Sequence, residues 1–295
     1  MARTREMKRS GPAPRRAKLR RGSPGTRDLA DAAPGEDANQ FVLALGRGVD
    51  VLSAFKAGDG PLGNAELAER TKLPKPTVSR ITYTLAKCGY LNFDSRSRLY
   101  ELGGGALALG RIALSNMDIR RLARPLMQEL ADHGNFNVGL GARDRHHMIY
   151  IEACEGRALI GLRLFVGSRI PIVTSAMGRA YLAAIDESER EKLLKELRPR
   201  HGDEWPALLK GFHRAARDLQ VRGFCMSLGE WQKDINGAAV PVRLPDAEQV
   251  YAVNLGGPAY MLREKQLVEE LGPRLVKLAD ELQRMVSKRS NGASR

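Results

Sequence analysis

Hydrophobic and polar positions alternate most regularly between residues 64 and 100, where the pattern predicts two short helices followed by a hairpin. The first predicted helix covers residues 64–70 and opens with Asn64, a residue type that caps helix N-termini. A tight turn leads to a second predicted helix over residues 75–85. Its apolar positions recur at helical spacing and should pack inward: Val78, Ile81 and Leu85.

The outer face of the second predicted helix carries hydroxyl and basic side chains. Such groups contact base edges and phosphates when a helix enters the major groove of DNA. The residues that we expect to bind DNA from this helix are Lys75, Thr77, Ser79, Arg80 and Tyr83.

Residues 90–100 alternate between apolar and polar side chains around an Asp94–Ser95 turn, a pattern typical of a β-hairpin. Arg96 and Arg98 lie near its tip, where their charges suit contacts with backbone phosphate. Together the helices and the hairpin predict a winged helix-turn-helix DNA-binding domain over residues 40–103. The alternative is a small helical subdomain that is basic without binding DNA.

Helical patterns also flank this region. One helix is expected over residues 40–57. Its apolar positions are Phe41, Leu43, Leu45, Val49, Leu52 and Phe55. Three glycines at residues 103–105 predict a flexible joint rather than a phosphate-binding loop, because no Lys-Ser/Thr pair follows them. One further helix is expected over residues 106–114, and another begins at Asp118, which is its expected cap. Residues 104–133 are therefore expected to form a linker and the dimer seam.

From residue 134 the pattern changes to short strands mixed with helices. Strands are expected at residues 136–140, 147–151, 159–165, 223–227, 238–242 and 249–253. Helices are expected at residues 174–184, 186–196 and 206–221, and a C-terminal amphipathic helix, kinked or split at Gly272–Pro273, should run to about residue 286. This order predicts an α+β domain on an antiparallel sheet over residues 134–288, followed by a disordered tail at 289–295.

Composition favours a polyanionic partner, because the formal net charge is +14 and the pI is about 10.0. Residues 1–39 are rich in arginine, glycine and proline, and we expect a disordered basic arm that follows DNA phosphates. The alternatives are a solvated tail, or an upstream start codon that is not the true one.

Several observations predict a cytoplasmic protein without a membrane partner. No apolar run approaches the ~20 residues that span a bilayer, and the arginine-rich start lacks the apolar core of a signal peptide. The cysteines form no CxxC pair, which favours reduced thiols. They are Cys88, Cys154 and Cys225.

Three segments resemble the IclR family of bacterial transcriptional regulators, and the resemblance covers residues ~40–288. Residues 73–80, followed by Gly89-Tyr90-Leu91, look like the family's recognition helix and entry to the wing. Residues 169–183 are similar to its signature of small residues around Gly178-Arg179-Ala180, and residues 223–242 resemble its second body motif. The resemblance implies a winged helix-turn-helix joined by a linker helix to an antiparallel-sheet (GAF/profilin-like) effector-binding domain.

The chain departs from the family pattern at three positions. Lys72 stands where the helix-turn-helix usually carries glycine, so either Lys72 adopts a left-handed conformation or the turn is built differently. Val173 replaces a commonly seen histidine, and Ser227 stands where some members present an acid. The last two departures bear on the identity of the effector.

By resemblance, the second domain binds a small molecule between its sheet and the helix that starts near Thr174. The implied lining is Leu159, Leu162, Ile170, Thr174, Ser175, Ala176, Met177, Ser227, Ile235 and Gly237. Most of these residues are apolar, none is acidic, and Thr174 and Ser175 lie where free backbone N–H groups can hold an anion. We therefore expect an organic acid, with an aromatic acid fitting better than a sugar. The alternative for each residue is a place in the core.

The predicted function is sequence-specific transcription regulation controlled by this acid, without a cofactor, a metal or catalysis. One winged domain contacts a single short half-site, so a dimer or tetramer on an inverted-repeat operator is expected. The alternatives are an enzyme acting on a small metabolite, although Gly-x-Ser-x-Gly is absent, and a non-specific architectural DNA binder. A metal sensor using His146, His147, Cys154 and Cys225 lacks a known zinc-ligand spacing.

Overall fold

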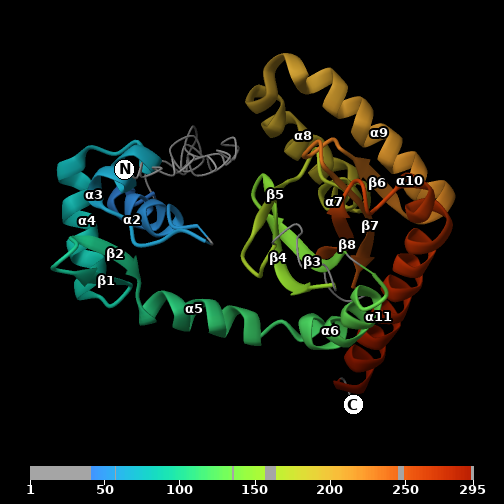
Figure 1. Ribbon diagram of the computed structural model, residues 1–295, viewed down its shortest axis with the longest axis horizontal. Coiled ribbons are helices and arrows are strands. Elements are labelled where there is room, and N and C mark those ends of the chain that lie inside the picture. The colour runs from blue at the N-terminus through green and yellow to red at the C-terminus, as the bar shows by residue number, and fades with distance from the viewer. Residues whose placement is uncertain (1–40, 57, 135, 157–163, 245–248, 294–295) are drawn as a thin grey trace, which may run out of the picture. The chain divides into compact units, whose positions relative to one another are not determined.

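The computed structural model describes residues 41–56, 58–134, 136–156, 164–244 and 249–293 of the 295-residue chain (Figure 1). Contacts divide the chain into two compact units, Met1–Ala106 and Leu107–Arg295. The predicted basic arm and the predicted lining residues Leu159 and Leu162 lie outside the described residues.

Within its described residues, the first unit contains helices and a two-stranded wing. The helices are α2 (Leu43–Ser53), α3 (Asn64–Thr71) and α4 (Lys75–Lys87), and the strands are β1 (Leu91–Asp94) and β2 (Leu99–Leu102). The strands are antiparallel, and an isolated bridge joins Leu62 to Tyr100. The core contains Val51, Leu62, Leu67, Val78, Leu91 and Tyr100. These elements form the winged helix-turn-helix that the sequence predicts.

Helix α2 is shorter than predicted, and of the predicted apolar positions Leu52 and Phe55 pack against the core. It begins at Leu43 rather than at residue 40, and Val51 and Ala54 are the buried apolar positions at its C-terminal end. Four of the predicted apolar positions are instead exposed: Phe41, Leu43, Leu45 and Val49. The apolar residues of this segment are too numerous for one narrow stripe, so part of the set faces outward.

Asn64 does not cap α3, contrary to the sequence prediction. Gly63 holds the N-cap position and Asn64 is the first helical residue. Its Nδ2 donates to Ser79 Oγ at 3.0 Å, and its Oδ1 accepts from Thr82 Oγ1 at 3.1 Å. Asn64 therefore joins the two helices of the helix-turn-helix.

Lys72 resolves the first departure from the family pattern. Its φ and ψ of 57° and 20° place it in the left-handed region at the C-cap of α3. The turn thus keeps the geometry that usually favours glycine. A lysine in this left-handed conformation is less favourable than a glycine would be.

Two of the three glycines in the predicted flexible joint at 103–105 pack against the backbone of Gly89. Gly103 is buried, and a Cβ there would overlap the carbonyl oxygen of Gly89. Gly105 N donates to that same oxygen at 3.0 Å, and helix α5 (Gly104–Ser115) already begins at Gly104. Close backbone approach explains glycine at 103 and 105, whereas a Cβ on the exposed Gly104 would meet no atom within 4 Å.

The second unit is built on an antiparallel sheet with strand order β5-β4-β3-β8-β7-β6. Its strands are β3 (Asn137–Asp144), β4 (His147–Cys154), β5 (Arg169–Pro171), β6 (Cys225–Leu228), β7 (Ile235–Arg243) and β8 (Val250–Pro258). The short β5 was not predicted; the strand predicted at 159–165 falls mostly outside the described residues, and Leu164 and Phe165 are not in a strand. The predicted α+β class is confirmed.

Helices cover both faces of this sheet (Figure 1). One core contains residues of α6 (Asp118–Ala131) and α11 (Gly272–Ala293), and the other contains residues of α7 (Ala176–Ala184), α8 (Glu187–His201) and α9 (Trp205–Arg222). Short turns complete the unit: a 3₁₀ turn at Gly202–Glu204, α10 at Glu264–Gln266 and a π turn at Leu267–Leu271. No helix in the described part of the chain is long and apolar enough to cross a membrane.

Two further sequence predictions concern helix ends in this unit. Asp118 does not cap α6: Met117 is the N-cap, and Asp118 forms an ion pair with Arg121 within the first turn. The C-terminal helix is neither split nor broken at Gly272–Pro273: it changes there from the π turn ending at Leu271 to α geometry, with Gly272 in the right-handed helical conformation. A Cβ at Gly272 would overlap the ring of Phe224, so the sheet packs closely against the helix there.

Candidate DNA-binding face and effector site

The outer face of α4 displays the side chains predicted to contact DNA. Lys75, Ser79, Arg80 and Tyr83 are exposed, whereas Thr77 is half-buried. Val78 is buried on the opposite side. The ammonium group of Lys87 lies 5.6 Å from the centre of the Tyr83 ring and extends the basic surface by one turn.

Ser79 differs from the other predicted contacts because it already accepts the hydrogen bond from Asn64. Its hydroxyl proton remains available for an acceptor on DNA. Ser79 therefore has a structural role in addition to any role in recognition. Asn64, predicted as a helix cap, supports α4 instead.

The wing turn is organised by the carboxylate of Asp94. It accepts from Arg96 N at 3.0 Å and from Ser97 Oγ at 2.6 Å, while Arg98 N donates to the Asp94 carbonyl oxygen at 2.8 Å. The hydrogen bond from Ser97 is the main reason that the pKa of Asp94 is lowered. Arg96 and Arg98 are exposed, and neither forms an ion pair with another described residue.

In the second unit, the start of α7 meets the end of β6. Ser227 Oγ donates to the carbonyl oxygen of Thr174 at 2.8 Å, and Cys225 Sγ donates to that of Ala176 at 3.4 Å. Ser175 is the N-cap of α7: its Oγ donates to Pro171 O at 2.6 Å and accepts from Gly178 N at 3.1 Å. The hydroxyl protons of Ser175 and Ser227 are thus committed to backbone carbonyls.

The apolar residues predicted to line the effector site form part of the core between α7 and the sheet. Ile170 and Met177 are fully buried, and a Cβ on Gly141 would overlap the Met177 sulfur. Gly237 lies between Ser227 on β6 and Gly256 on β8, so small residues cover this end of the sheet. Ile235 is half-buried at the start of β7.

A buried polar pair that the sequence did not predict lies on the same face of the sheet. Asn254 Nδ2 donates to the hydroxyl of Tyr150 at 3.0 Å, whereas Asn254 Oδ1 has no partner among the described residues. Asn254 precedes Gly256 by two residues on β8 and therefore shares its face. Burial raises the pKa of Tyr150, which keeps its hydroxyl protonated. An asparagine within an otherwise apolar strand was the available signal.

A second missed group is the buried guanidinium of Arg179 in α7. Its Nε donates to Val173 O at 2.8 Å and its Nη2 to Glu230 Oε2 at 2.7 Å. Arg214 Nη2 lies 2.5 Å from the other Glu230 oxygen. The valine that replaces the family's histidine therefore contributes its carbonyl oxygen to holding Arg179.

The two cysteines that a metal sensor would use, Cys154 and Cys225, lie on opposite faces of the sheet. Cys154 belongs to the core under α6 and α11, and Cys225 belongs to the core under α7, on the other face of the sheet. Burial raises the pKa of the Cys154 thiol to about 11 and that of the Cys225 thiol to about 12. Both thiols stay protonated at neutral pH and are poor metal ligands in that state.

Comparisons with known proteins match both units. The family described as "Bacterial transcriptional regulator IclR C-terminal" matches residues 111–284, and the "IclR helix-turn-helix domain" matches residues 44–95. Among curated relatives, the chain is 32% identical to the HTH-type transcriptional regulator TsaQ1/TsaQ2 of Comamonas testosteroni over 250 residues, covering 84% of this chain and 90% of that protein.

Solved structures give the same result. The chain is 43% identical to an IclR family transcriptional regulator from Brucella abortus, with a TM-score of 0.74 over 88% of this chain and 97% of the other. An IclR homolog from Microbacterium hydrocarbonoxydans, solved with 4-hydroxybenzoate, shares the fold at 21% identity and a TM-score of 0.65, over 82% and 98% of the two chains. With both domains matched in order, the chain belongs to the IclR family of bacterial transcriptional regulators.

Proposed function

We propose that this regulator binds an inverted-repeat operator through α4 and the wing, and that a small aromatic acid bound in the second unit changes its affinity for that operator. The observation that supports the first half is the set of exposed side chains on α4 and the wing. Arg80, Arg96 and Arg98 have no carboxylate partner among the described residues, so their charges are available to DNA.

Recognition of an inverted repeat requires two copies of the chain. Helix α5 supports self-association because it has no buried residue, and three of its apolar side chains are exposed: Leu107, Leu109 and Ile112. Apolar exposure along one helix favours packing against a second copy. The proposed seam thus lies within residues 104–133, in a dimer or tetramer.

The start of α7 offers backbone donors for the carboxylate of the acid. The hydroxyl groups of Ser175 and Ser227 do not supply the donors for the carboxylate, because both donate to backbone carbonyls. The N–H groups of Ala176 and Met177 in the first turn of α7 have no acceptor in the described part of the chain. We assign the carboxylate to these N–H groups, which the helix dipole supports.

The polar pair on β4 and β8 supplies a second contact. Asn254 Oδ1 is buried without a donor, and the Tyr150 hydroxyl keeps its proton after accepting from Asn254. A ring hydroxyl on the effector would donate to Asn254, while its oxygen would accept from Tyr150. Aromatic acids with a hydroxyl group therefore suit the site better than unsubstituted acids.

Thermal unfolding of the full chain with 4-hydroxybenzoate tests the effector half. Binding to the folded state should raise its stability by about 2.7 kcal/mol at a hundredfold excess over Kd. Uncharged 4-hydroxybenzamide is the matched control and should bind at least tenfold more weakly. The affinity for benzoate should lie between the affinities for these two compounds. The substitution Asn254→Leu should reduce the affinity for benzoate less than the affinity for 4-hydroxybenzoate.

Selection from random DNA tests the other half, with the protein in the presence or absence of 4-hydroxybenzoate. We expect a preferred sequence with two inverted half-sites and an affinity that the acid alters. Absence of a preferred sequence would support the architectural alternative. Turnover of the acid would support an enzyme, and binding of only cationic or polyhydroxylated compounds would contradict the proposed effector class.

A further inference from the structure

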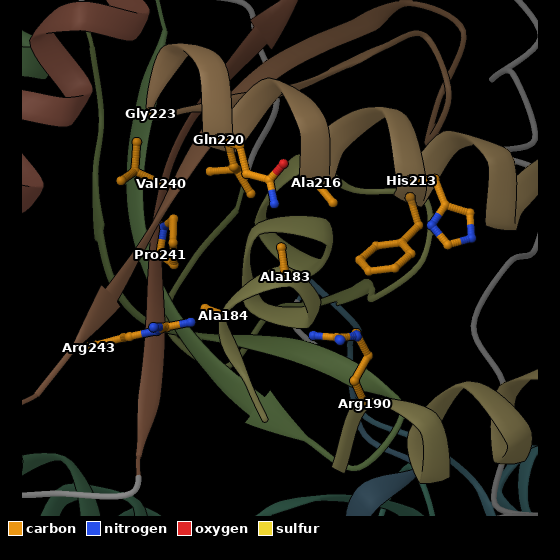
Figure 2. Close-up of a pocket in the computed structure, with 12 residues that line it drawn as sticks. Ala183, Ala184, Arg190, His213, Ala216, Gln220, Gly223, Val240, Pro241 and Arg243 are labelled. Atoms are coloured by element: carbon orange, nitrogen blue, oxygen red, sulfur yellow. The ribbon is translucent and has the colours of Figure 1, made fainter. Parts of the chain in front are cut away.

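A cavity lies at the opposite end of α7 from the proposed effector site (Figure 2). Its volume is about 430 Å³, within the range of small-molecule sites. The C-terminal end of α7, the start of α8, the second half of α9 and the end of β7 surround it. Because α7 has nine residues at a rise of ~1.5 Å each, its ends lie roughly 13 Å apart.

The cavity exists because β6 is shorter than its neighbour. β6 pairs only with residues 236–239 of β7, which leaves residues 240–243 without a strand on that side. Small side chains line the adjoining helices, among them Ala183 and Ala216. An added strand would find no N–H at Pro241, so this edge suits a compact ligand better than a peptide strand.

The charges around the cavity favour an anion. Arg190 and Arg243 line it, and no lining residue is acidic. In Figure 2 the two guanidinium groups extend from opposite sides toward the space beside Ala183 and Ala184. Arg243 forms no ion pair within the described chain; Arg190 donates to Ile185 O at 3.3 Å and has Glu187 3.9 Å away.

The Glu187 partner leaves most of the Arg190 charge available. The Glu187 carboxylate is 81% exposed, so solvent screens this pair strongly. The Arg190 bond to Ile185 O also offsets the partial negative charge at the end of α7, which would otherwise repel an anion. Between the two arginines the walls are apolar, with Phe212, Leu219 and Val240 among the lining residues.

We propose that this cavity binds a small dicarboxylate, whose acid groups pair with Arg190 and Arg243 while its hydrocarbon part lies against the apolar walls. The regulator would then have two ligand sites of different chemistry at the two ends of α7. This site does not depend on the aromatic acid proposed above, since the two share no residue.

Isothermal titration of the full chain with adipate tests the proposal. Hexanoate has the same number of carbons and one charge less, so it should bind at least tenfold more weakly. Arg243→Gln and Arg190→Gln should each weaken adipate at least tenfold and reduce its advantage over hexanoate. Arg222→Gln is the control, because Arg222 is exposed at the end of α9 outside the cavity, and it should leave adipate binding unchanged.

Two further variants separate this site from the effector site. Ala216→Glu introduces a carboxylate into a half-buried wall and should abolish adipate binding, with circular dichroism confirming that the chain is folded. Asn254→Leu should leave adipate binding intact. No binding of adipate, equal binding of adipate and hexanoate, or loss of adipate through Asn254→Leu alone would overturn the proposal.

Discussion

Arg179 donates a 2.7 Å hydrogen bond to Glu230 across 51 positions of the sequence. The first residue belongs to the Gly178-Arg179-Ala180 signature and the second to the body motif that starts at Gly223. The side chain of Arg179 is 1% exposed, so its charge depends on this partner. The ion pair explains physically why these two motifs occur together, because each supplies half of one buried interaction.

Removing the carboxylate should destabilise the second unit. Glu230→Gln leaves the buried guanidinium without its counter-charge, and we expect a loss of about 1–3 kcal/mol, below the value for fully buried pairs because Glu230 is partly exposed. Urea unfolding at neutral pH measures the change. Glu187→Gln is the control and should stay within about 0.5 kcal/mol, since its pair is solvent-screened. Equal effects of both substitutions would contradict the assigned role.

The same ion pair predicts a pH dependence of stability. Burial alone raises the pKa of Glu230, but the hydrogen bonds and charges of Arg179 and Arg214 outweigh burial and lower it. A lowered pKa in the folded state stabilises the protein above the unfolded value of about 4.3, and this contribution is lost as pH falls through the folded pKa. The stability difference between wild type and Glu230→Gln should therefore stay constant from neutral pH to about 5 and shrink below about 4. A difference that does not change at acidic pH would show that the carboxylate does not act through its charge.

Asn64 offers a separate test in the first unit. Asn64→Ala removes both hydrogen bonds that join α3 to α4, and we expect a loss of about 0.5–1.5 kcal/mol in stability. The loss stays moderate because the single hydroxyl proton of Thr82 has an alternative acceptor in Val78 O, 3.0 Å away. Asn92→Ala, at an exposed position on β1, should leave stability unchanged. A wild-type melting temperature for Asn64→Ala would show that the Asn64 contacts contribute nothing.

A feature of the fold could be predicted from the sequence when the residues that form it are close together in the chain. The spacing of apolar positions such as Val78 and Leu91 predicted a helix and a strand, because this periodicity is local. Asn64 and Asp118 lie at helix starts as predicted, but each is one position inside the helix, and this shift changes the role of the side chain. The pairing of Asn254 with Tyr150 spans 104 positions and has no local pattern.

The basic arm is expected to add affinity without selecting sequence. Deleting residues 1–38 removes the segment in which basic side chains most outnumber acidic ones. The preferred DNA site should stay the same, while the slope of log affinity against log salt becomes shallower, because fewer counterions are released. Fluorescence anisotropy at several salt concentrations measures this slope. An unchanged slope would show that the arm does not contact DNA.

The last prediction separates base recognition from phosphate binding within the first unit. Arg80 is exposed on α4 and Arg98 on the wing turn, so the two substitutions should have different effects. Arg80→Ala should cost about 1–3 kcal/mol at the selected operator and little on random DNA, because it removes a contact with a base. Arg98→Ala should weaken both complexes by similar factors and flatten the salt dependence, because it removes a contact with phosphate. Competition binding with operator and random duplexes of equal length gives the ratio of the two affinities. If Arg80→Ala left that ratio unchanged, the exposed face of α4 would not be the face that reads the operator.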